Sequence, residues 1–462
     1  MKLKYIIGIL LLTGGMSLQG QNYLSLDSCR RLALENNNKS KSAQMQFKKM
    51  RYEVNAYRAN FFPRISAQGM YLFTTGDFNY HNRFDMYKTN IPSMIGSLPL
   101  PEWAVGYLDQ FYKALYADID LTVKPNNTFL AGITFEQPVF MGGKITAAYK
   151  MSKIGREMAQ LNLELTDAEV ILKTDEAYWQ YVKVIELYTT ALKYKEVVEN
   201  VCTDAQNGME AGMIAQNDLM KAQVKLGDAK LMLRQAENGK RLAQTNLCMV
   251  TGMNLFTEIL PLDTLSDELP LALLDNMPEV TSRIEYRLLK KQLELKKQQV
   301  NLSRSDFLPQ LGITGGYNYL NGVMLNDTKL FDKASFSAIV SLKIPLTQWG
   351  EGVNRIRSAK ADLYMAEYQL QETANLLQLE IMQAYNTLDE TILKTDIARL
   401  EHQQTTENLR IANDRYELGL ETLSALLEAQ VLWQQARNKY IEAKASLRTV
   451  ESDYLRISGK RK

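Results

Sequence analysis

The stretch NGMEAGMIAQNDLMKAQ, residues 207–223, returns 207 residues later as DRYELGLETLSALLEAQ, residues 414–430. Both versions carry a glutamate two residues before a glycine and an Ala-Gln pair ten residues after that glycine. Working outward, the same offset aligns residues 138–252 with residues 345–459 without a gap. A repeat of this length exceeds the roughly 20–50 residues of solenoid repeats, so it indicates an internal duplication.

The duplication continues upstream at a different offset. Phe62-Pro63 corresponds to Leu308-Pro309, a shift of 246 rather than 207, so the first copy contains a connection 39 residues longer. An insertion of this kind fits a surface loop, because the entropy of loop closure grows slowly with length.

The N-terminus, residues 1–20, has the features of a secretory signal peptide. Two lysines precede a short apolar run at residues 5–12, and small and polar residues follow up to Gly20. Cleavage there removes two of the 54 basic residues and leaves 52 against 52 acidic ones. Such a neutral chain does not favour nucleic acid as a partner. No later stretch approaches the roughly 18 apolar residues of a transmembrane helix.

The composition offers little for catalysis or metal binding. Two histidines, His81 and His402, have no paired metal-ligand spacing, and three cysteines are too few for a disulfide framework. We therefore predict no catalytic, cofactor-binding or metal-binding residues. Cys202 and Cys248 fall on opposite arms of a predicted helical hairpin, about 39 Å apart along it, so they cannot pair within one chain.

Four segments alternate with the period of β-strands: residues 64–74 and 129–137 in the first copy, and 310–320 and 335–344 in the second. Each has one apolar face rich in aromatics and one face of small or polar residues. This pattern fits membrane-spanning strands, although a small soluble antiparallel sheet would give a similar signal. The apolar positions are Ile65, Ala67, Gly69, Tyr71; Phe129, Ala131, Ile133, Phe135; Leu311, Ile313, Gly315, Tyr317, Tyr319; and Phe336, Ala338, Val340, Leu342.

Long helices surround these strands. Residues 24–62 are predicted to form one helix ending at Pro63. Hairpins are predicted over residues 145–249 and 352–457, with coiled-coil spacing and turns at Gly208–Gly212 and at Gly419. A helical arm of about 62 residues would reach roughly 90 Å. The expected division is a first structural repeat at 21–252, a linker at 253–281 and a second repeat at 282–462.

Four strands cannot close a transmembrane barrel, since about eight is the minimum. An open sheet edge is forbidden in lipid because its backbone groups would lack partners. If the strands span a membrane, several chains must therefore share one barrel, with the polar faces lining its lumen. The connections 75–128 and 321–333 would then be extracellular, because every strand pair starts and ends at a helix. The first connection is rich in aromatics, which could bind sugars or lipids or pack over the barrel mouth.

The order of these elements resembles the outer-membrane efflux proteins, the TolC-like family. The resemblance spans the whole mature chain and rests on the opening LSL at 24–26, the junctions FFP at 61–63 and FLP at 307–309, Pro138 and Pro345, Ala177-Tyr178, Arg415-Tyr416, and Ala-Gln at 222–223 and 429–430. It implies an α+β membrane protein, a homotrimer with a shared twelve-stranded barrel in the outer membrane and an α-helical tunnel in the periplasm. It also implies export without chemistry, in partnership with outer-membrane lipid, a periplasmic adaptor (a membrane fusion protein) and an inner-membrane pump of the RND or ABC type. The alternative is a soluble periplasmic coiled-coil scaffold without a pore.

The resemblance also implies functional positions at the helix tips. In the family, acidic residues just past the second tip line the constricted entrance, and the matching positions here are Ala425 and Glu428, so one carboxylate is missing. The first copy has Asp218 and Lys221 at those positions. Glu428, Asp218 and Tyr416 are therefore the candidate gate residues, and Gly208, Gly212 and Gly419 mark turns for adaptor docking. A solvated helix face and ordinary packing remain the alternatives for the gate positions.

Overall fold

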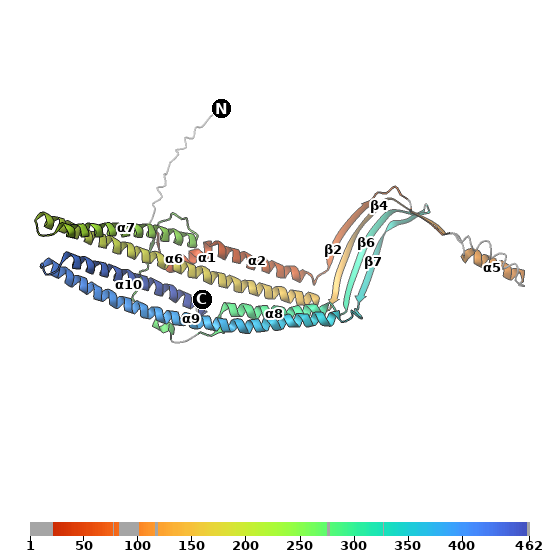
Figure 1. Ribbon diagram of the computed structural model, residues 1–462. Coiled ribbons are helices and arrows are strands. Elements are labelled where there is room, and N and C mark those ends of the chain that lie inside the picture. The colour runs from red at the N-terminus through yellow and green to blue at the C-terminus, as the bar shows by residue number, and fades with distance from the viewer. Residues whose placement is uncertain are drawn as a thin grey trace, which may run out of the picture. The chain divides into compact units, whose positions relative to one another are not determined.

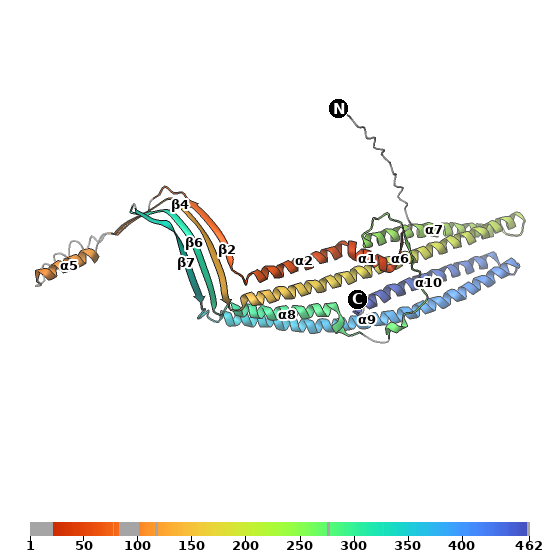
Figure 2. The same cartoon turned by 180° about the vertical axis from the view of Figure 1, so that it is seen from behind.

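The computed structural model describes residues 22–76, 78–82, 101–115, 119–274, 278–326 and 328–459. The predicted signal peptide at 1–20 lies outside these ranges. The chain is α+β and mostly helical (Figures 1 and 2). It divides into a helical unit, within residues 1–52, 153–296 and 362–462, and a sheet unit, residues 53–152 and 297–361.

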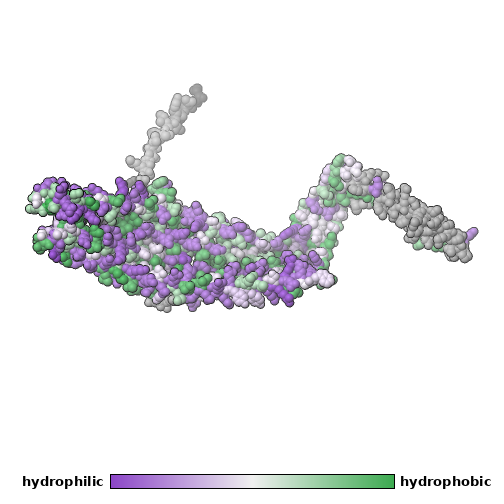
Figure 3. Space-filling view, viewed as in Figure 1, coloured by the Kyte–Doolittle hydropathy of each residue, from purple (hydrophilic) through white to green (hydrophobic). Residues whose placement is uncertain are grey.

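Two helical hairpins dominate the chain. The first joins α6 (Lys144–Glu210) to α7 (Gln216–Thr251), and the second joins α9 (Glu351–Glu417) to α10 (Leu423–Ile457). Helices α6 and α9 both have 67 residues and begin 207 residues apart. Hydrophilic and hydrophobic residues are mixed over the visible surface of these helices (Figure 3). No helix in the described part of the chain is long and apolar enough to cross a bilayer.

The prediction of one helix over residues 24–62 is wrong. The segment forms α1 (Leu26–Asn36) and α2 (Asn38–Ala59), separated by Asn37 in an extended conformation. The Asn37 amide donates to the Val250 carbonyl (3.0 Å), and its side-chain oxygen accepts from the Lys39 N–H (2.8 Å). This asparagine therefore ends one helix and caps the next, which is a role its side chain suits better than a helix interior. Helix α2 has the same length, 22 residues, as α8 (Ile284–Ser305), which begins 246 residues later.

The linker at 253–281 packs against the hairpins instead of hanging free. It contains β5 (Ile259–Pro261), which pairs in parallel with β1 (Asn22–Leu24), and the short 3-10 helices η1 (Leu271–Leu274) and η2 (Val280–Ser282). The Tyr178 hydroxyl lies 2.8 Å from the Asp263 carboxylate, and the Tyr440 hydroxyl donates to Asp267 (2.7 Å). Hydroxyl contacts from α6 and α10 thus fix the linker on the helical unit.

The main core of the helical unit lies where the linker crosses α6, α7 and α10. Cys29, Tyr178, Tyr181, Leu247 and Ile259 are fully buried there. All three cysteines are free and buried. Cys202 and Cys248 do not pair, as their spacing along the hairpin predicts. Burial raises the pKa of the Cys29 thiol to about 12, so it stays protonated and unreactive.

The sheet unit is built on one antiparallel sheet in the order β2-β4-β6-β7. Its strands are β2 (Arg64–Leu72), β4 (Ile119–Met141), β6 (Gln310–Leu325) and β7 (Thr328–Lys343). A fifth strand, β3 (Phe78–Asn82), pairs with the same edge of β4 as β2 does, but nearer the start of β4, at residues 119–123. The described sheet is therefore at most four strands wide at any point along its length.

Strand lengths differ from the prediction. Strand β2 ends at Leu72, two residues early, whereas β4, β6 and β7 extend well beyond the alternating segments. The predicted connection at 321–333 is wrong, because β6 and β7 stay paired up to Leu325 and Thr328 and only residues 326–327 join them. Backbone pairing continues there although the apolar alternation has stopped. The longer first connection holds β3 and α5 (Glu102–Leu115).

The register places all four predicted apolar faces on the same side of the sheet. Ile65 lies opposite Phe135, Ile133 opposite Tyr317, and Ile313 opposite Val340. Directly opposed residues in an antiparallel pair point to the same face. Their side chains are exposed in the single chain, and the other face carries Ser66, Gln68, Thr134, Thr314, Ser337 and Ser341.

A buried ion pair connects three helices of the helical unit. Asp175 on α6 is fully buried and accepts two hydrogen bonds from the Arg30 guanidinium on α1, at 2.7 and 2.9 Å. The Ser452 hydroxyl on α10 donates to the same carboxylate (2.8 Å). Arg30 also pairs with Asp27 (2.7 Å), whose side chain is 88% exposed. One arginine therefore holds a buried and an exposed carboxylate.

We predict that Asp175→Ala destabilises the protein far more than Asp27→Ala. The first variant leaves Arg30 without its buried partner, which costs about 3 kcal/mol, whereas an exposed pair contributes less than about 1 kcal/mol. Thermal unfolding of the purified protein, followed by circular dichroism in detergent, compares the two midpoints. Equal midpoints would show that the buried pair does not stabilise the fold.

Candidate functional site: the helix-tip turns

The turn between α6 and α7 is a Schellman motif. Gly212 has φ +72°, its N–H donates to the Met209 carbonyl (2.9 Å), and the Met213 N–H donates to the Gly208 carbonyl (2.8 Å). A Cβ at Gly208 would lie 2.8 Å from Ile214 Cδ1, so this glycine lets Ile214 pack on the end of α6. Gly212 thus supplies a left-handed backbone that most residues avoid, and Gly208 leaves space for the end of the Ile214 side chain.

The turn between α9 and α10 has the same backbone motif with different side chains. Gly419 has φ +72° and donates to the Tyr416 carbonyl (2.9 Å), and the Leu420 N–H donates to the Arg415 carbonyl (2.8 Å). Arg415 and Glu421, which correspond to Gly208 and Ile214, form an ion pair at 3.5 Å. The Thr422 hydroxyl accepts from the Ala425 N–H (3.2 Å) and caps α10, whereas Ala215 offers α7 no side-chain cap. The second turn therefore has more side-chain support.

One apolar cluster joins the two tips. Its buried members come from α6 (Val201, Cys202, Ala205), α7 (Leu219, Ala222) and α10 (Leu423, Leu426, Leu427). Tyr416 on α9 packs against it partly buried, and burial together with the negative charge of Asp204 raises the pKa of its hydroxyl. Tyr416 therefore contributes packing between the hairpins in the single chain.

The structure compensates the charge of Asp218. The Lys221 ammonium lies 2.9 Å from the Asp218 carboxylate and donates to the Ser424 hydroxyl on α10 (3.2 Å). This contact ties the first tip to the second. The i, i+3 spacing of Asp218 and Lys221 could have indicated the pair from sequence, but nothing in the sequence pointed to Ser424.

Glu428 differs from Asp218 in its surroundings. It is exposed on α10, one turn beyond Ser424, and makes no ion pair or hydrogen bond with any residue that the structure describes. At the two candidate gate positions, Lys221 therefore compensates the Asp218 carboxylate, whereas the Glu428 carboxylate has no compensating partner. Such a site has no apparent chemistry beyond electrostatics.

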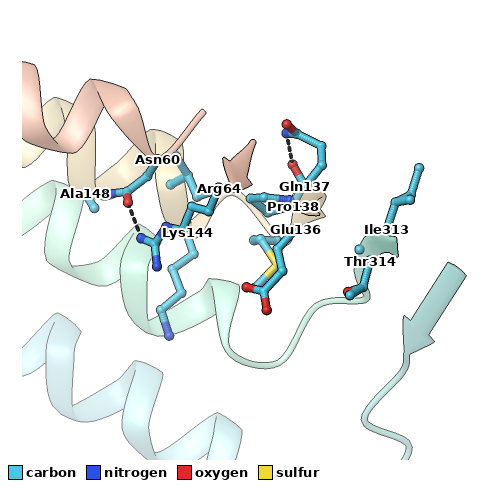
Figure 4. A pocket seen from close by; sticks show the side chains of 12 residues that line it. Asn60, Arg64, Glu136, Gln137, Pro138, Lys144, Ala148, Ile313 and Thr314 are labelled. Atoms are coloured by element: carbon cyan, nitrogen blue, oxygen red, sulfur yellow. Dashed lines mark hydrogen bonds between the residues drawn. The ribbon is translucent and has the colours of Figure 1, made fainter. Parts of the chain in front are cut away.

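A second polar region lies in the sheet unit, where β4 leads into α6. A cavity of about 420 Å³ opens there (Figure 4). Arg64 lies directly opposite Glu136 on the neighbouring strand, on the polar face, and donates to the Asn60 side chain (2.6 Å). Lys144, also at the rim, pairs with Asp306 (2.9 Å). The cavity thus combines charged groups of both signs with the apolar side chains of Met141, Ile145 and Ile313.

The chain matches the outer membrane efflux protein family over residues 30–253 and 287–459, and it belongs to that family. It is thus an outer-membrane efflux protein with its helical tunnel in the periplasm. Protein CyaE of Bordetella pertussis is 24% identical over 69% of this chain and 68% of its own length. Outer membrane protein TolC of Vibrio cholerae is 23% identical over 66% of this chain and 72% of its own.

Solved structures with the same fold include two outer-membrane channels. The Campylobacter jejuni CmeC channel superposes with a TM-score of 0.71 at 20% identity, covering 94% of this chain and 85% of its own. The open state of the Neisseria gonorrhoeae MtrE channel gives 0.70 at 15% identity, covering 94% and 88%. These likenesses establish the fold alone.

We predict that Gly419→Ala loosens the second tip and that Gly419→Asn does not. A left-handed backbone costs alanine about 1 kcal/mol, while asparagine tolerates it, and a Cβ at this position meets open space. Hydrogen exchange of the tip amides should therefore quicken about fivefold in the alanine variant only. Equal exchange in both variants would contradict this account of the turn.

Proposed function

We propose that this chain is the outer-membrane export channel of a tripartite efflux or type I secretion system. It assembles as a homotrimer and passes substrates from an inner-membrane pump, through a periplasmic adaptor, to the exterior. It carries out no chemical step. The register of the sheet supports this proposal best, because it gives one continuous apolar face and a second face on which small and polar residues are mixed with a few apolar ones, Met70, Leu130, Leu320 and Ile339.

The barrel follows from the width of the sheet. Four strands per chain cannot close, and three copies supply twelve. The apolar face turns to lipid, and the face with Ser66, Thr134, Thr314 and Ser341 lines the lumen. The mixed-charge cavity around Arg64 and Glu136 lies on that polar face, so it belongs to the substrate path. In the proposed channel, the connection between β6 and β7 and the longer connection that holds α5 face the exterior.

The helix tips form the periplasmic entrance. The Schellman turns at Gly212 and Gly419 present ordered backbone for docking of the adaptor. Three copies of Glu428 around the axis place like charges close together, and packing of the tips offsets their repulsion. Asp218 adds little to this ring because Lys221 compensates it. Such a ring attracts cations and disfavours anions.

We predict that Val340→Lys disrupts membrane assembly and that Ile339→Lys does so only mildly. The two residues are neighbours on β7 but lie on opposite faces of the sheet. A lysine on the lipid face near mid-bilayer costs about 2–4 kcal/mol. The yield of folded protein in the outer-membrane fraction measures the effect. Equal losses from both substitutions would count against the barrel.

We predict that Glu428→Ala raises single-channel conductance in planar bilayers and weakens cation selectivity. Glu442→Ala is the matched control, because Glu442 is exposed and unpaired among the described residues, on the same helix and about 21 Å away. Glu401 is a poorer control, since Lys439 compensates it at 2.5 Å. Indistinguishable currents from the two variants would place the gate elsewhere.

The alternative expected from the sequence, a soluble periplasmic scaffold without a pore, does not agree with the outer membrane efflux family to which the chain belongs. Fractionation separates the two, because a channel requires the protein in the outer membrane and a scaffold requires extraction with the soluble periplasm. Recovery in the periplasmic fraction, with no currents in bilayers, would overturn the proposed channel.

A further inference from the structure

His402, on α9, lies in a polar network where the second hairpin meets α6 and the linker. Its side chain is half-buried, and its ring stacks on that of Tyr440 on α10, with the centroids 5.8 Å apart. The Trp433 ring, also on α10, lies 6.3 Å away. His402 precedes the end of α9 at Glu417 by fifteen residues, about 22 Å along the helix. The network is therefore close to the second tip.

The hydrogen bonds of His402 define its protonation state. Arg437 Nη1 lies 3.4 Å from His402 Nε2, and Thr406 Oγ1 lies 3.5 Å from Nδ1. A guanidinium group can only donate, so Nε2 accepts from Arg437 and the imidazole carries its single proton on Nδ1. His402 is thus neutral in this structure, and its contact with Arg437 ties α9 to α10.

Glu186, on α6, is a second acceptor within reach of the same arginine. Its Oε2 atom is buried and accepts no hydrogen bond from any residue that the structure describes. Arg437 Nη2 lies 3.9 Å away and Lys444 Nζ lies 4.0 Å away, both beyond hydrogen-bond distance. Lys444 is already engaged, since it donates to the Leu265 carbonyl of the linker (3.1 Å). Arg437 is therefore the better placed cation to complete the hydrogen bonding of Glu186.

The linker side of the network keeps its charge over a wide range of pH. The Tyr440 hydroxyl donates to the Asp267 carboxylate (2.7 Å), and burial together with this contact raises the pKa of Tyr440 to about 12. The same hydrogen bond and the nearby charge of Lys444 hold the pKa of the Asp267 carboxyl below its usual value. Asp267 therefore stays ionised and occupied while His402 titrates.

His402 itself gains a proton only under acidic conditions. Burial, followed by the charges of Arg437 and Lys444, lowers the pKa of its imidazole from the usual 6.5. The neighbouring carboxylate on α9, Glu401, is paired with Lys439 and offers the ring no compensation. Histidine is the side chain whose charge changes closest to neutral pH, so His402 is the group in this network that responds to mild acid.

We infer that His402 is a proton-sensitive switch in the second hairpin: the neutral imidazole holds Arg437 on α9, and the protonated imidazole releases Arg437 to Glu186 on α6. Protonation of Nε2 removes the acceptor and places two cations within 3.4 Å of each other. The Glu186 carboxylate, which lacks a donor at Oε2, receives the arginine after a short movement from 3.9 Å.

Acidification thereby exchanges a contact between α9 and α10 for a contact between α6 and α10. In the proposed channel, this exchange loosens α9 from α10 near the entrance, so conductance rises. The effect on the entrance rests on the proposed function, whereas the exchange of contacts concerns the fold of one chain and does not.

The first copy of the repeat shows that the hairpin fold does not need this network. The positions equivalent to His402, Arg437, Tyr440 and Lys444 hold Lys195, Lys230, Leu233 and Glu237. Helices α6 and α7 form the same hairpin without an imidazole there. The network is thus an addition to the second hairpin.

Fluorescence of Trp433 reports the protonation of His402, because an imidazolium quenches a neighbouring indole more strongly than a neutral imidazole does. The full-length protein in detergent should lose emission as the pH falls from about 8 to about 4.5. His402→Gln and Trp433→Phe should each abolish this loss, and His81→Gln, which changes the other histidine, should retain it. Glu186→Gln should lower the midpoint. An emission loss that persists in His402→Gln, or an unchanged midpoint in Glu186→Gln, would overturn the switch.

A double-mutant cycle detects the movement of Arg437. Arg437→Gln, Glu186→Gln and the double variant give the coupling between the two side chains as the non-additive part of their shifts in thermal midpoint. The coupling should grow about threefold on the acid side of the fluorescence midpoint, because a charge-assisted hydrogen bond replaces a longer ion pair. In a His402→Gln background, whose amide oxygen still accepts from Arg437, it should stay constant. Equal coupling on both sides in the unsubstituted background would show that Arg437 does not move.

Currents in planar bilayers separate this inference from the proposed function. The ratio of conductance on the acid side to that on the neutral side should be larger in the unsubstituted protein than in His402→Gln, since protonation of Glu428 affects both equally. Equal ratios would refute control of the entrance and leave the channel standing. The expected fluorescence and coupling without any currents would refute the channel and leave the exchange of contacts standing.

Discussion

Backbone hydrogen bonding at the sheet edges is the constraint on which the rest of this structure depends. The outer N–H and C=O groups of β2 and β7 have no partner within the described chain. In hydrocarbon each such group costs several kcal/mol, so an open edge in lipid is not a stable state. A single copy of the chain therefore cannot expose both edges of this sheet to lipid. In the proposed channel, trimerisation, the lumen and the arrangement of helices around it all follow from closing those edges.

At the helix tips of the proposed channel, in contrast, repulsion between the Glu428 carboxylates of neighbouring copies opposes closure of the entrance. The apolar cluster shared by α6, α7 and α10, with Tyr416 beside it, brings the two hairpins of one chain together before any second copy arrives. The Lys221 bridge to Ser424 adds a polar tie between them. In the proposed channel, these contacts within one chain favour an opening of the entrance that separates neighbouring chains over one that separates the two hairpins of a chain.

The sequence predicted the features that depend on periodicity and repetition. The hairpins lie within about two residues of the expected bounds, and the alternating faces of the strands meet in register. It missed features that depend on a single side chain or on a partner strand. Asn37 divides a helix because its amide reaches Val250, far away in sequence. Strands β6 and β7 outlast their apolar alternation because each pairs with the other. The contact of Lys221 with Ser424 could not be predicted either, because Ser424 lies 203 residues away on the other hairpin.

The two copies of the repeat have the same backbone conformation at the tip turns but different side-chain contacts there. The tip turns share every Schellman hydrogen bond, yet Gly208 and Ile214 pack where Arg415 and Glu421 form an ion pair. Past the turn, the first copy has the compensated pair Asp218 and Lys221, and the second has Ala425 and an unpaired Glu428. In the proposed trimer, Lys221 compensates Asp218 in every first copy of the repeat, whereas Glu428 of every second copy keeps its charge. At these equivalent positions the like-charge repulsion around the proposed entrance therefore comes from the second copies alone.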